Sequence, residues 1–308
     1  MRVLRQQKVE QSLRHLLRSS MATSHSRIVT CGLIAGFIYL PLWLRDVVLG
    51  TLVGAGSVLM LAALSLGFYL LWRGRRQLGT LSASAEDRLL GYLIIFGGIG
   101  LSPFCFSAEW SQKLVCMLIL IGIACSSWGI EFFKQHPVPT FLIGLGLFPN
   151  AYAVGHEIWQ TFTPPLLLER LMAWAGTLGL QAIGQPAVAD GTVIALPAGA
   201  VKVEWACNGF NMAAEIAVAS LVLGLFLKQN LPRLTLLVVT GMVLALLLNV
   251  PRIMLMAMAE AYWGKASFDF WHGLWGGQIF STILFTIYYY VVMAIVKGRS
   301  GSKSVSSS

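Results

Sequence analysis

Long apolar runs separated by short charged or turn-forming segments dominate the sequence. Crossing about 30 Å of hydrocarbon takes about 20 residues of helix, and eight runs come near this length. The pattern therefore predicts an all-α polytopic membrane protein with about eight transmembrane helices. The predicted spans are residues 28–44, 47–72, 89–106, 114–133, 138–154, 207–227, 234–251 and 274–296.

Residues 155–206 break this pattern because they are too polar to cross a membrane. Residues 164–184 place apolar side chains at helical spacing, interrupted by Glu169 and Arg170, which is typical of a helix at the membrane surface. We expect the next part of this segment to form a small β-hairpin that leads into the span beginning at Cys207. Turn signals separate the two strand-like runs, which are Val193–Leu196 and Val201–Trp205.

The charged residues give this picture an orientation. Only 11% of the residues are charged, whereas a soluble domain carries roughly 25%, and the mean hydropathy is +0.73. Basic residues gather at alternate ends of the predicted spans, and cytoplasmic loops carry an excess of Lys and Arg. We therefore expect a protein of the cytoplasmic (inner) membrane with both termini in the cytoplasm and residues 155–206 on the outer face. The cytoplasmic basic sites would be the N-terminal tail, residues 72–76, Lys134, Lys228 with Arg233, and Lys297 with Arg299.

The net charge of +9 does not indicate nucleic-acid binding, because no basic face with interleaved aromatic residues lies outside the predicted spans. Residues 1–27 are interpreted as a basic cytoplasmic tail, with a membrane-surface anchor and a transit peptide as the two open interpretations. Residues 28–296 are expected to form a single membrane domain. Residues 297–308 are rich in Gly and Ser, which predicts a disordered cytoplasmic tail.

Cysteine usage singles out one residue. The five cysteines include no C-x-x-C pair and no His/Cys cluster, so neither a disulfide framework nor a zinc site is predicted. Four of them lie inside apolar runs, where a cysteine usually only packs. Cys207 instead sits between a polar stretch and an apolar run, where the start of a helix would favour its nucleophilic thiolate. Asn208 and Gly209 follow, and Gly209 would let a substrate come close.

Two further side chains are predicted at the same depth as Cys207. Cys207 lies 21 residues before Lys228, about 31 Å of helix, and Arg252 lies 19 residues after Arg233, about 28 Å. His272 precedes the last span, which ends at the cytoplasmic side. A nucleophilic cysteine needs a proton partner and a group that stabilises the oxyanion, and these residues supply both types. Taken singly, Arg252 could extend to lipid headgroups and His272 could belong to an interfacial aromatic belt.

Three separated motifs resemble the exosortase/archaeosortase family. The resemblance covers roughly residues 135–296 and lies within the eight-span frame. It rests on a Gly-x-Pro before the hairpin, a Leu-Pro turn, an acidic residue before Ala-Cys-x-Gly, an Asn-x-x-Arg and a histidine before a glycine-containing last span. In this chain these are Gly184–Pro186, Leu196-Pro197, Glu204, Ala206–Gly209, Asn249–Arg252 and His272.

The resemblance implies a membrane-embedded cysteine protease or transpeptidase. Its substrates would be secreted proteins with a C-terminal signal made of a short motif such as Pro-Glu-Pro, a transmembrane helix and a basic cluster. By carry-over, Cys207 is the nucleophile, His272 the acid and base, and Arg252 the group that stabilises the oxyanion or the substrate. Water or an acceptor amine would resolve a thioacyl enzyme, without a metal or cofactor, and membrane lipid would surround the protein.

The chain departs from the family pattern beside the nucleophile. Asn208 stands where serine is frequent, and Phe210-Asn211 stands where an aliphatic residue and arginine are common, so the substrate class is less secure than the reaction type. Asn211 and Glu215 share a helix face with Cys207, and a Glu inside a span needs a partner, for which we expect Arg252. Supporting roles are also expected for Glu204, which either orients the site or pairs with Lys202, and for Gly209 and Asn249.

Two other functions stay open from the residues alone. A channel, transporter or assembly scaffold would use the intramembrane polar groups to line a path, although it would predict repeat symmetry that the sequence does not show. A thiol-dependent acyltransferase acting on lipid or glycan would need Cys207 but no protein signal. Smaller expectations are a solvated loop end at His156-Glu157 and an interfacial position for Glu131 and His136.

Overall fold

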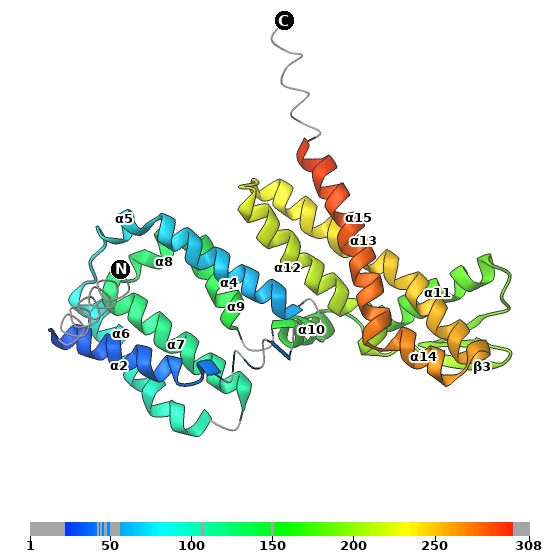
Figure 1. Cartoon of the computed structure of the whole chain (residues 1–308), viewed down its shortest axis with the longest axis horizontal. Helices are drawn as coiled ribbons and strands as arrows, with labels where there is room; N and C mark the ends of the chain where they lie inside the picture. The colour runs from blue at the N-terminus through cyan, green and yellow to red at the C-terminus, as the bar shows by residue number, and fades with distance from the viewer. Residues whose placement is uncertain are drawn as a thin grey trace, which may run out of the picture. The chain divides into compact units, whose positions relative to one another are not determined.

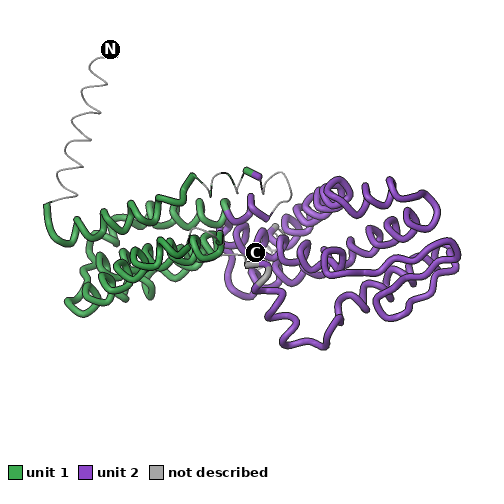
Figure 2. Tube along the Cα trace, turned by 90° about the horizontal axis from the view of Figure 1, so that it is seen from below, with its two compact units in different colours: residues 1–48, 61–150 green, residues 49–60, 151–308 purple. Residues whose placement is uncertain are grey.

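The computed structural model describes residues 22–41, 43, 45, 48–49, 56–105, 108–148 and 151–297. The chain divides into two compact units, residues 1–48 with 61–150 and residues 49–60 with 151–308, which Figure 2 colours separately. Most of the predicted N-terminal tail and nearly all of the C-terminal tail lie outside the described residues. Each unit is described by itself below.

The described part of the first unit is helical (Figure 1). Gly91 and Gly122 let α6 and α7 touch, because a Cβ added at Gly91 would lie 2.5 Å from the backbone nitrogen of Ser126. Small residues allow such close approach between membrane helices. The elements are α2 (Ser24–Phe37), α4 (Gly56–Arg73), α5 (Arg75–Leu78), α6 (Ala85–Leu101), η1 (Ser102–Cys105), α7 (Glu109–Trp128), α8 (Glu131–Gln135) and α9 (Pro137–Leu147). The first residues of α4, up to Met60, are counted with the second unit.

The second unit places a small antiparallel sheet among helices. The sheet has three strands in the order β1-β2-β3, namely β1 (Val188–Asp190), β2 (Val193–Leu196) and β3 (Gly199–Lys202). The helical elements are α10 (Ala151–Phe162), α11 (Leu167–Ala182), η2 (Trp205–Cys207), α12 (Phe210–Phe226), α13 (Leu231–Met258), the π-helical η3 (Ala259–Trp263), α14 (Lys265–His272) and α15 (Leu274–Lys297).

The predicted hairpin is present, with two differences. Strand β2 has the predicted bounds, but its partner β3 covers Gly199–Lys202 instead of Val201–Trp205, because the chain turns into η2 at Trp205. A third strand, β1, was not expected and pairs Val188 with Ala195. The hairpin therefore ends before the cysteine, and a short helical turn carries the chain from the sheet to Cys207.

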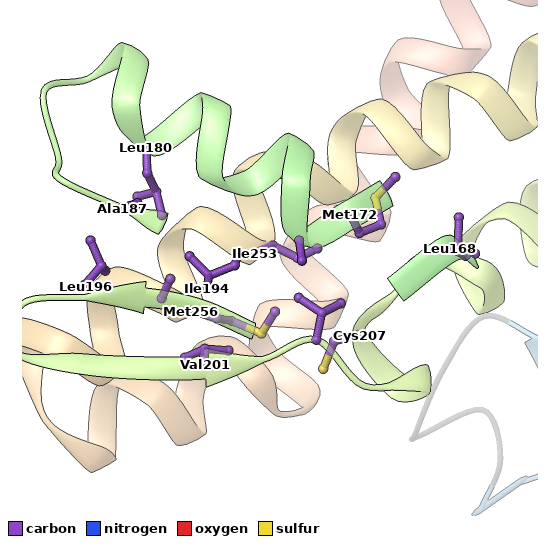
Figure 3. Packing of buried hydrophobic residues seen from close by; sticks show 13 residues of the cluster. Leu168, Met172, Leu180, Ala187, Ile194, Leu196, Val201, Cys207, Ile253 and Met256 are labelled. Carbon is purple, nitrogen blue, oxygen red and sulfur yellow. The ribbon is translucent and has the colours of Figure 1, made fainter. Parts of the chain in front are cut away.

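One hydrophobic core joins the sheet to α11 and α13 (Figure 3). Ile194 and Val201 project from β2 and β3 and are buried, as expected for one covered face of a sheet. The predicted surface helix at 164–184 is α11, and its apolar side packs into this core. Cys207 belongs to the same cluster, which also contains Leu168, Met172 and Leu180 from α11 and Ile253 and Met256 from α13.

The helices confirm a polytopic all-α membrane protein. Among the described residues, five helical segments are long and apolar enough to cross a membrane, namely Gly56–Arg73, Ala85–Cys105, Trp110–Trp128, Leu231–Trp263 and Leu274–Val296. Pro137–Leu147 and Phe210–Phe226 are shorter apolar helices. The predicted span 138–154 is not one helix, since α9 ends at Leu147, Phe148 is extended, and α10 begins at Ala151. The total of eight spans stays a prediction.

Candidate active site

Cys207 ends the single turn η2, and its N–H donates to the carbonyl of Glu204 at 2.9 Å. Helix α12 begins only at Phe210, after Gly209, which adopts a left-handed conformation with φ of +85°. A Cβ added at Gly209 would lie 3.0 Å from Nδ2 of Asn249. Glycine is therefore required here both by its backbone angle and by the closeness of α13.

One turn of α13 holds the backbone of two predicted catalytic segments. The Nδ2 group of Asn249 donates to the carbonyl of Cys207 at 2.8 Å, and Nη2 of Arg252 donates to the carbonyl of His272 at 3.3 Å. Residues three apart share a helix face, so the Asn-x-x-Arg spacing places both donors on one side of α13. Pro251 lies between them inside the helix.

Cys207 and His272 line the same cavity, which has a volume of about 290 Å³. His272 is exposed, and its ring stacks on Phe268 with centroids 5.2 Å apart and an interplanar angle of 12°. This stacking covers one face of the imidazole ring. The other lining residues are Val201, Lys202, Val203, Glu204 and Met256.

Arg252 is 8% exposed, and its Nε group is buried without a hydrogen-bond partner. No ion pair involving Arg252 is found in the part of the chain that the structure describes. An unpaired buried donor is costly, and an N–H of this kind beside a candidate nucleophile could donate to an oxygen that gains charge during a reaction.

The environment of Cys207 favours the thiol over the thiolate. Burial raises the pKa of the Cys207 thiol, Arg252 acts in the opposite direction, and Glu204 adds a smaller increase. The start of a helix was expected to lower this pKa, but burial raises it, and Asn208 and Gly209 separate Cys207 from α12. To act as a nucleophile, a thiol with a raised pKa would need a base, and His272 lines the same cavity.

The supporting residues fall into two groups. The turn Trp205–Gly209 is called the nucleophile turn below, after the predicted role of Cys207. Asn208 is buried in this turn and Asn249 is buried against it, whereas Glu204 lies at the surface and pairs with Lys202 at 3.4 Å, with both side chains more than 60% exposed. This pair is the second of the two alternatives expected for Glu204. Asn211 is half-buried in the first turn of α12.

The expected pairing of Glu215 with Arg252 is wrong. No ion pair joins these two described residues, and Arg252 is engaged by the carbonyl of His272. Glu215 instead faces Gly56 and Tyr152, because a Cβ added at Gly56 would lie 3.4 Å from Oε1 of Glu215 and 3.3 Å from the hydroxyl of Tyr152. The helix face that Glu215 was expected to share with Cys207 is not formed, because Cys207 lies in η2 and α12 begins only at Phe210.

His156 is not the solvated loop end that we expected. It lies within α10, half-buried, with its ring centroid 4.6 Å from that of Trp205 and 5.5 Å from that of Phe210. These two aromatic residues flank the nucleophile turn, so α10 supports the turn from a further side. The sequence signal was weak, since a His-Glu pair at the end of an apolar run is common at membrane surfaces.

Glu169 of α11 is a site neighbour that sequence reasoning missed. It is 5% exposed, and its Oε1 accepts a hydrogen bond from Nδ2 of Asn208 at 3.0 Å. The sequence did contain a sign of this role, because Glu169 interrupts a run of apolar residues at helical spacing. Among the described residues, no group of three or more His, Cys, Asp or Glu side chains is arranged to hold a metal ion.

Comparison with known proteins gives one match. The sequence pattern of the family described as transmembrane exosortase matches residues 53–289, well over half of the 308 residues. No curated protein and no solved structure matches the chain. The matched region contains the nucleophile turn, the α13 contacts and His272. The chain therefore belongs to the transmembrane exosortase family.

Proposed function

We propose that this exosortase is a cysteine protease or transpeptidase that cleaves the C-terminal sorting signals of secreted proteins. The signal would consist of a short motif, a transmembrane helix and a basic cluster. The active site would lie at the outer face of the cytoplasmic membrane, with both termini in the cytoplasm. The main support is the cavity of about 290 Å³ that is lined by both Cys207 and His272.

The proposed reaction begins when the Cys207 thiol transfers its proton to His272 and the sulfur attacks a backbone carbonyl carbon of the signal. The C–N bond then breaks, His272 returns the proton to the leaving amine, and a thioacyl enzyme forms. Water or an acceptor amine attacks the thioester and releases the thiol. During each attack, the free Nε–H of Arg252 would donate to the oxyanion.

Two features support this assignment of roles. Arg252 is fixed beside the site through the carbonyl of His272, and it is close enough to Cys207 to affect the pKa of the thiol. The stacking on Phe268 orients His272. Nucleophile, proton carrier and oxyanion donor are the three parts that acyl transfer requires.

The test is co-expression with a tagged secreted protein that carries a C-terminal motif, helix and basic tail. Wild type, Cys207→Ser, Arg252→Ala and His272→Ala would be compared by immunoblot, and membrane fractionation would check insertion. We expect wild type to shorten the substrate and each inserted variant to leave it intact. Glu157→Gln is the matched control, because the side chain of Glu157 is exposed and does not line this cavity. Cleavage by Cys207→Ser would overturn the cysteine mechanism and favour a scaffold.

A further inference from the structure

The carboxylate of Glu169 is buried in a part of α11 where its neighbours are apolar. Leu168, Met172 and Ala173 all belong to the hydrophobic core, and Glu169 is itself only 5% exposed. No Lys, Arg or His in the described part of the chain forms an ion pair with it. Burying a carboxylate without a cation is costly unless its hydrogen bonds compensate.

The hydrogen bond that Glu169 accepts comes from the residue after the candidate nucleophile. Asn208 is 2% exposed, its Nδ2 donates to Oε1 of Glu169 at 3.0 Å, and its Oδ1 accepts from the N–H of Phe210 at 2.8 Å. An ionised carboxylate only accepts hydrogen bonds. Glu169 therefore selects the amide orientation in which Oδ1 of Asn208 meets the first N–H of α12.

Two residues from different helices therefore form hydrogen bonds with the nucleophile turn. Asn249 of α13 binds the carbonyl of Cys207, and Glu169 of α11 binds the side chain of Asn208. A well-packed apolar pair at positions 169 and 208 would usually be at least as stable as a buried polar pair. Stability alone therefore does not explain the Glu169–Asn208 contact, whereas a fixed conformation at the reacting sulfur does.

We propose that Glu169 is a positioning residue that fixes the Asn208 turn so that the Cys207 sulfur is held in its cavity. This inference rests on the proposed function and deepens it by adding α11 to the site. The proposal requires one hydrogen-bond donor and one acceptor at positions 169 and 208. Which of the two positions carries the carboxylate is less important than this complementarity.

The test exchanges donor and acceptor in the full-length, membrane-inserted chain. Asn208→Asp sets two carboxylates against each other. The double variant Glu169→Gln with Asn208→Asp restores one donor and one acceptor, and the new carboxylate at position 208 can still accept from the N–H of Phe210. Glu169→Gln alone keeps an acceptor, Glu169→Leu removes it, and the exposed Glu157→Gln is the matched control.

Two rates would be measured per inserted molecule. The first is cleavage of the signal-bearing substrate. The second is alkylation of Cys207 by a maleimide, which needs no substrate and reports opening of a thiol that is only 4% exposed. The other cysteines would be replaced by alanine throughout, namely Cys31, Cys105, Cys116 and Cys125.

We expect Asn208→Asp and Glu169→Leu to slow cleavage about 100-fold, because small misplacements of a reacting group cost this much, and to speed alkylation about tenfold through local opening. The double variant, Glu169→Gln and Glu157→Gln should stay within about threefold of wild type in both rates. A double variant no better than Asn208→Asp would overturn the proposal, as would wild-type rates in Glu169→Leu. If wild type cleaves nothing but alkylation follows the expected pattern, the positioning role holds and the proposed function fails.

Discussion

Gly209 offers the sharpest quantitative test of the site geometry. Its φ of +85° costs a residue with a Cβ about 1–2 kcal/mol. An alanine Cβ would also lie 3.0, 3.1 and 3.2 Å from Nδ2, Cγ and Cβ of Asn249. The Asn249 side chain would have to move, and the hydrogen bond to the carbonyl of Cys207, worth about 0.5–1.5 kcal/mol, would be lost.

The two costs together give about 1.5–3.5 kcal/mol against the turn conformation seen here. At about 1.4 kcal/mol per factor of ten, Gly209→Ala should lower the cleavage rate about 10- to 300-fold. The assay is pulse-chase cleavage of the tagged substrate, with the rate divided by the amount of inserted enzyme.

Gly184→Ala is the matched control for this substitution. Gly184 has a nearly identical φ of +84°, but a Cβ added there would meet nothing within 4 Å. The substitution Gly184→Ala imposes the same backbone strain away from the nucleophile turn, so the cleavage rate per inserted molecule should stay close to that of wild type. If Gly209→Ala cleaves as fast as Gly184→Ala, the contact between Asn249 and the turn does not position Cys207.

Three further predictions address the charged groups around the sulfur. Arg252→Lys should lose about 100- to 1,000-fold in cleavage rate, as we also expect for Arg252→Ala, because one ammonium nitrogen cannot occupy the positions of both Nη2 and Nε; wild-type cleavage by Arg252→Lys would refute this. Since burial raises the pKa of the Cys207 thiol, its alkylation rate should increase with pH through a midpoint above the ordinary thiol value of about 8.5. This midpoint should move up in Arg252→Ala and down in Glu204→Gln, and the opposite shifts would contradict the assigned electrostatics. Lys202→Ala should change thermal stability by about 1 kcal/mol or less, because its pair with Glu204 is exposed; a larger loss in a melting experiment would show that the pair is structural.

Apolar patterning predicted the helices well because hydrophobicity alone decides which segments can cross a membrane. It failed at residues 138–154, where α9 and α10 are separate helices within one apolar run. Strand β2 was predicted from its β-branched residues and flanking turns, whereas β1 was missed because Val188–Asp190 is short and exposed.

The site residues show a similar limit. Motif spacing singled out Cys207, Arg252 and His272, of which Cys207 ends η2 and His272 ends α14. Arg252 was expected at the end of a span, but it lies inside α13, which continues to Met258. Partners across helices could not be predicted, because spacing defines a face of one helix but not the helix opposite to it. Glu215 was assigned the wrong partner for this reason, and Glu169 was missed because a charge in an amphipathic helix is usually solvated.

The two contacts from α13 to the nucleophile turn and to His272 end on backbone carbonyls, which every amino acid has. Replacement of the side chain at position 207 or 272 removes chemistry without removing an acceptor of Asn249 or Arg252. Cys207→Ser and His272→Ala should therefore keep their architecture and retain an uncut signal at the cavity. Such inactive chains would serve as traps for purifying the natural substrates directly from membranes.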